Sequence, residues 1–265
     1  MNVVIIFSGA CKHCWNNSYN YYDSFKNHIL EPLMKEYNIY IFIGCQENEK
    51  KDWENELTNK LPSNVISNIF ILDELKSNMD CRFSTDLCLR HHHREGYLQQ
   101  YGKLHYTYKK CLDYMKDIDF QYAIKLRFDL IYNSQDYFYC EWFKKLKKNT
   151  LMAPSTEFHC YDRWNERNPS MWPHAMCEQI IAGDKKMMDI YFNWFTCKEL
   201  YNQNIKHQDT EHLLADYLIL KKINLATFDL QYSRPGGHNF ALGRNNYWLP
   251  KRVNDNELTY CKNIL

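Results

Sequence analysis

Short apolar runs alternate with amphipathic segments along the first half of the chain, and this alternation limits the possible folds. The runs at 2–8, 37–43 and 68–72 have the length and composition of buried strands. A segment at 102–116 has helical spacing instead. Its apolar positions are Leu104, Tyr108, Cys111 and Met115. Strands that alternate with helices predict an α/β fold with a mostly parallel central sheet and flanking helices.

The segment 122–132 is a predicted strand that carries three charges. Its apolar residues alternate with Lys125, Arg127 and Asp129. An isolated charge is costly to bury, so these side chains pair with one another, with a ligand or with a metal. A carboxylate between two cations suits a metal-bound diphosphate, with Asp129 on the metal and Arg127 or Lys125 on phosphate oxygens. A partly solvated strand with a structural Arg127–Asp129 pair is an equal alternative.

Several small or acidic residues follow the predicted strands. Ser8 and Gly9 end the first strand, Gly44 and Asp73 follow the next two, and Asp129 belongs to the fourth. Ligands of open α/β sheets bind beyond the carboxyl ends of the strands. These residues are therefore expected along one edge, where they would line a single cleft.

The second half of the chain is less regular. The apolar run at 151–154 predicts another short strand, and the run at 177–182 predicts a strand or a turn. Asp184 is placed to cap a following helix. A polar, aromatic loop spans 157–172. A later helix is expected to begin near Asp209 or Thr210, either of which would be a normal N-cap, with Glu211 in its first turn. No linker, repeat or low-complexity tract interrupts the chain, which favours one domain over residues 1–265.

The composition excludes several classes of protein. Apolar residues make up 45% and charged residues 25%, as in ordinary globular chains, and the net charge of +1 gives no case for nucleic acid. No apolar run approaches the roughly 18 residues of a membrane span, and no secretion signal precedes the first strand. We expect a soluble, cytoplasmic protein whose 11 cysteines are reduced thiols.

The order of these features resembles that of GT-A type glycosyltransferases, especially the small WavE-like and large-DNA-virus sugar transferases. In that family a Tyr-x-Ile-(Lys/Arg)-x-Arg-x-Asp strand replaces the usual Asp-x-Asp, and residues 122–129 read YAIKLRFD. The early Ser8-Gly9 turn and a late Gly-Gly-His at 236–238 also match. The resemblance covers most of the chain. It implies a GT-A-like, Rossmann-like domain with a nucleotide-sugar half at 1–135 and an acceptor half at 136–265.

The resemblance also implies roles in donor binding. Ser8 and Gly9 match the turn that accommodates the nucleotide. Asp129 matches the metal-binding acid and His238 the late histidine of the metal site, which implies Mn²⁺ or Mg²⁺ as cofactor. Arg127 stands where the family has its first acid, and a cation there would bind phosphate directly and weaken the dependence on metal.

Further roles concern the acceptor. Asp209 and Glu211 match the acidic pair that supplies the general base of inverting members, and Glu211 is preferred because Asp209 serves as a helix cap. Aromatic rings in the polar loop suit sugar faces, although they would equally fill a second small core. The acceptor candidates are Arg163, Trp164, Trp172 and Glu178.

The sequence therefore predicts an enzyme that transfers a sugar from a nucleotide-sugar donor to a hydroxyl of a glycan or glycoprotein. Two alternatives stay open. One is a non-catalytic carbohydrate-binding or scaffold protein with the same fold. The other is a nucleotidyl- or phosphotransferase that uses the same cleft, although the chain has no Gly-x-x-x-x-Gly-Lys-Ser/Thr phosphate loop.

Overall fold

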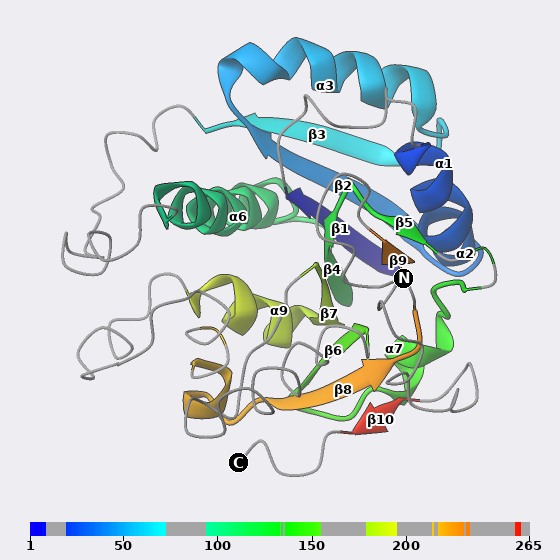
Figure 1. Cartoon of the computed structure of the whole chain (residues 1–265), viewed down its shortest axis with the longest axis vertical. Helices are drawn as coiled ribbons and strands as arrows, with labels where there is room; N and C mark the ends of the chain where they lie inside the picture. Colours follow the sequence, from blue (N-terminus) through cyan, green and yellow to red (C-terminus); the bar gives the residue numbers. More distant parts are fainter. Residues whose placement is uncertain are drawn as a thin grey trace.

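Eight strands form one mixed sheet in the computed structural model of the chain (Figure 1). The structure describes residues 1–8, 20–72, 94–132, 134, 136–154, 179–194, 214, 217–230, 232–233 and 258–260. The strands of the sheet are β1 (Asn2–Ser8), β2 (Asn38–Cys45), β3 (Ile66–Ile71), β4 (Tyr122–Arg127), β6 (Thr150–Pro154), β7 (Ile180–Asp184), β8 (Asn224–Phe228) and β10 (Thr259–Tyr260). Their order is β10-β8-β6-β7-β4-β1-β2-β3.

Six of these strands run in one direction. β4, β1, β2 and β3 pair in parallel, and so do β6 and β8. β7 is antiparallel to both β4 and β6, and β10 is antiparallel to β8. The predicted α/β fold with a mostly parallel sheet is therefore confirmed, and two reversed strands make that sheet mixed.

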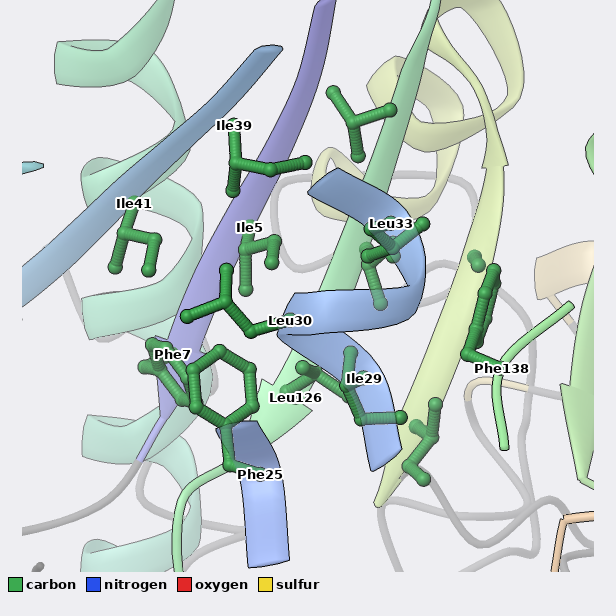
Figure 2. Packing of buried hydrophobic residues seen from close by; sticks show 14 of the residues in the cluster. Ile5, Phe7, Phe25, Ile29, Leu30, Leu33, Ile39, Ile41, Leu126 and Phe138 are labelled. Carbon is green, nitrogen blue, oxygen red and sulfur yellow. The ribbon is translucent and has the colours of Figure 1, made fainter. Parts of the chain in front are cut away.

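Helices cover both faces of the sheet. One face carries the continuous helix formed by α1 (Tyr21–Phe25), η2 (Lys26–Leu30) and α2 (Glu31–Met34), together with α3 (Glu47–Lys60) and α7 (Glu141–Lys145). Figure 2 shows Phe25, Ile29, Leu30 and Leu33 of the continuous helix packed over Ile5 of β1 and Leu126 of β4. The other face carries α6 (Arg94–Tyr114) and α9 (Lys185–Phe192). No helix within the described residues is both long and apolar enough to cross a membrane.

Several predicted elements are confirmed. The first strand has the predicted bounds. The four apolar positions predicted for the helix at 102–116 are buried, three of them in α6 and Met115 just after its end. Asp184 caps α9 by accepting a hydrogen bond from the backbone N–H of Met187 at 2.8 Å. α3 begins at Glu47, earlier than its apolar residues indicate, because Gln46 and Glu49 cap its polar first turn.

The predicted charged strand is shorter than expected. β4 ends at Arg127, the chain bends at Phe128 and Asp129, and β5 (Ile131–Tyr132) pairs with β9 (Tyr232–Ser233) in a separate two-stranded sheet. The bend is fixed by packing, because Phe128 is buried against the rings of Trp53 and Phe7 at 5.2 and 6.4 Å between centroids.

Pro32 lies inside the continuous helix instead of ending it. A proline has no N–H to donate to the carbonyl four residues earlier, which here belongs to His28. That carbonyl accepts a hydrogen bond from the backbone N–H of Phe138 at 2.8 Å, and the Cys140 thiol donates to the carbonyl of Pro32 at 3.4 Å. The proline thus gives the segment 136–140 a place to attach to the helix.

Candidate functional site

The sheet reverses its order of connection between β1 and β4. From β1 the chain leads outward to β2 and β3, returns through α6 on the opposite face, and adds β4 to the other side of β1. The connections from β1 and β4 therefore leave in opposite directions. In open α/β sheets, ligands bind at the carboxyl ends of the two strands that flank such a topological switch point.

Register brings the predicted strand ends together at this point. Ser8, the last residue of β1, lies directly opposite Arg127, the last residue of β4. The backbone N–H of Arg127 donates to the carbonyl of Gln179, just before β7, at 3.1 Å. Gln179 thus helps hold the end of β4, although nothing in the sequence pattern marks it.

Arg127 and Asp129 form a two-pronged ion pair across the bend that ends β4. Arg127 donates from Nε to Oδ1 of Asp129 at 2.8 Å and from Nη2 to Oδ2 at 2.7 Å. Each side chain is 12% exposed. The pair considered as an alternative from the sequence is therefore present, and it lies at the switch point.

Lys125 lies deeper in the sheet. Because strand side chains alternate, it shares a face with Arg127, and its register partners Ile6 and Ile181 are both buried. Its own exposure is 1%. Arg127 is therefore the cation of this strand that lies nearer the carboxyl ends of the parallel strands.

The Arg127–Asp129 pair disfavours the divalent metal that the resemblance implies at Asp129. Both oxygens of Asp129 already accept hydrogen bonds from Arg127. A Mg²⁺ ion about 2.1 Å from either oxygen would lie within about 5 Å of the guanidinium. Repulsion there would be roughly 7 kcal/mol at an effective dielectric constant of about 20, which offsets a large part of the attraction between the ion and the carboxylate. No cluster of three or more His, Cys, Asp or Glu side chains suited to a metal occurs among the residues that the structure describes.

The end of β2 is closed, in contrast to the end of β4. Gly44 lies at the carboxyl edge as predicted, but α6 packs directly on it. A Cβ at Gly44 would lie 1.9 Å from Oγ1 of Thr107 and 2.5 Å from Cδ1 of Leu72. The glycine therefore allows helix and strand to approach. The sequence correctly placed Gly44 at this edge, but the glycine is needed for packing against α6 and not for ligand access.

The remaining predicted site residues are outside the part of the chain that the structure describes. For Ser8 the structure gives the backbone alone. Gly9, Asp73, Arg163, Trp164, Trp172, Glu178, Asp209, Glu211 and His238 are not described. Their roles stay predictions from the sequence.

Comparisons with known proteins give structural likenesses alone. No family model and no curated protein matches the chain. Among solved structures, the galactosyltransferase LgtC in complex with donor and acceptor sugar analogues matches with a TM-score of 0.42 and 12% identity. The match covers 81% of this chain and 70% of that one. A likeness at this level does not place the chain in the family of that enzyme.

Proposed function

We propose that the protein is a glycosyltransferase that moves a sugar from a nucleotide-sugar donor to a hydroxyl of a glycan. The observation that carries this proposal is the Arg127–Asp129 pair opposite Ser8 at the switch point. A nucleotide binds at this place in doubly wound sheets. A guanidinium suits phosphate oxygens because its planar donors bind two of them at once.

The chemistry of transfer assigns a task to each group. The bond between the sugar carbon and the diphosphate oxygen breaks, a bond to the acceptor oxygen forms, and the electron pair leaves with the diphosphate. Arg127 stabilises the negative charge that develops there. The resemblance assigns Glu211 as the base that takes the acceptor proton, with Asp209 beside it and with inversion at the sugar carbon. It leaves Arg163, Trp164, Trp172 and Glu178 to hold the acceptor.

Mn²⁺ or Mg²⁺ at Asp129 and His238, the cofactor that the resemblance implies, is not part of this mechanism. Asp129 is already neutralised by Arg127, and a second cation on the same carboxylate would be repelled. No step of the proposed transfer uses a metal.

A donor panel tests the proposal. The protein is mixed with UDP-, GDP-, CMP- and dTDP-sugars, and both its melting temperature and the release of nucleotide with a glycan mixture are measured. One donor should raise the melting temperature with the logarithm of its concentration and release its nucleotide only when glycan is present. Folded protein that responds to glycans alone would favour the carbohydrate-binding alternative. Turnover of a nucleotide without glycan would favour the nucleotidyl- or phosphotransferase.

A further inference from the structure

The Arg127–Asp129 pair bears on how a donor diphosphate is neutralised. A carboxylate that binds a metal offers its oxygens to the ion, but here both oxygens face the guanidinium at 2.7 and 2.8 Å. These two hydrogen bonds use two of the five N–H donors of an arginine. They also fix the plane of the guanidinium, because both prongs of the fork are held at once.

The position of the pair puts a guanidinium at the ligand-binding edge. Arg127 is the final residue of β4 and lies opposite the final residue of β1. Its side chain is 12% exposed, so the surroundings screen its charge less than water would. An arginine stays protonated at every pH at which the protein is folded, whereas a bound metal depends on the supply of free ion.

We propose that Arg127, oriented by Asp129, is the cation that binds the donor diphosphate, so that donor binding and sugar transfer need no divalent metal. This inference rests on the proposed function. In it Asp129 is a positioning residue: it holds the guanidinium in one orientation and does not touch a metal. Arg127 neutralises the β-phosphate oxygen as the bond from that oxygen to the sugar carbon breaks, and the acceptor proton leaves to the base.

The alternative is a pair that only ties the bend at residues 128–129 to β4. Phe128 already fixes this bend through its buried contacts with Trp53 and Phe7. A purely structural pair predicts that its variants lose stability while nucleotide affinity stays the same. Affinity and stability are therefore measured on the same samples.

The experiment is calorimetric titration of the full chain with UDP, GDP, CDP and dTDP, each in EDTA and each in Mn²⁺. The nucleotide that binds should do so with dissociation constants that agree within about 3-fold between the two buffers. Arg127→Lys keeps the charge but loses the fork, and it should weaken binding at least 10-fold. Asp129→Asn should weaken binding less than Arg127→Lys and should stay insensitive to EDTA. Thermal melts of each variant establish that it is folded.

A matched control removes a positive charge elsewhere. Lys144→Met in α7 breaks an exposed network with Glu36, which follows α2, and with Glu141 of α7, and it should leave nucleotide affinity unchanged. If the neutral double variant Arg127→Gln/Asp129→Asn folds, it should lose binding in both buffers.

Three results would contradict the inference in distinct ways. Binding that requires Mn²⁺ and disappears in Asp129→Asn would overturn it while the proposed glycosyltransferase stands. Binding that is unchanged in a folded Arg127→Lys would reduce the pair to a structural tie. Folded wild-type protein that binds no nucleotide in either buffer would overturn the proposed function together with the inference.

Discussion

The ends of β2 and β4 lie on the same edge of the sheet, yet they are built in opposite ways. Near the end of β2, Gly44 is covered by Thr107 of α6, with no room for even one added carbon. β4 ends at a charged pair whose two side chains keep part of their surface in solvent. The difference teaches that packing on a strand end decides whether that end can be a candidate site. α6, which connects β3 to β4, packs on β2, whereas the switch point lies between β1 and β4.

The largest effect is expected at the end of β4. Arg127→Ala should lower kcat/KM for the nucleotide-sugar donor by about 10²- to 10³-fold, because it removes the charge that we propose stabilises the leaving diphosphate. It should also lower the free energy of unfolding, since Asp129 would be left partly buried without this partner. Steady-state kinetics and urea unfolding measure the two effects separately. An unchanged kcat/KM would mean that the end of β4 has no role in donor turnover and so does not differ from the end of β2 in function.

The end of β2 should respond through stability alone. Gly44→Ala should cost about 2 to 3 kcal/mol of unfolding free energy, because the new Cβ meets Thr107 at 1.9 Å. Nucleotide affinity should be unchanged. Thr107→Ala in the same chain should restore part of the loss, which a double-mutant cycle measures as coupling. Strictly additive effects would mean that the two residues do not meet.

The opposite end of β4 provides a smaller contrast. Asp184 lies across from Tyr122 in register and caps α9. Asp184→Ala should cost about 1 kcal/mol of unfolding free energy, and Asp184→Asn much less, because asparagine is an equally good cap. Chemical denaturation gives both values. A change in nucleotide affinity in either variant would show that the two ends of the strand are coupled.

The smallest effect concerns the layer that closes β2. Burial lowers the pKa of His105 in α6, and its Nδ1 forms a hydrogen bond with the carbonyl of Phe192 at 2.8 Å. The unfolded chain therefore takes up a proton at a higher pH than the folded chain does. The contribution of neutral, buried His105 to the free energy of unfolding is full above pH 6.5 and falls as the pH drops below that value. His105→Gln should flatten this part of the pH profile of unfolding relative to wild type, and an identical slope would contradict the prediction.

Local patterns predicted the elements that depend on nearby residues. The bounds of β1, the buried stripe of α6 and the cap at Asp184 follow from apolar spacing and from one side chain. The reversed direction of β7 and the position of β8 depend on long-range pairing that no local pattern encodes. At the site, the sequence supplied Arg127 and Asp129 and the choice between pair and metal. The ion pair spans the bend after Arg127, and this bend depends on contacts of Phe128 with residues far away in the chain.

The place of β1 between β2 and β4 has a consequence for the folding of the chain during its synthesis. Its first neighbour, β2, is complete at Cys45, whereas its second neighbour, β4, is complete only at Arg127. Roughly 80 residues separate these points, which is about 4 to 16 s of translation. During that interval Val3, Ile5 and the other buried residues of β1 border an open, apolar edge. Nascent chains that stop before β4 should therefore aggregate or occupy chaperones, whereas chains that include β4 should not.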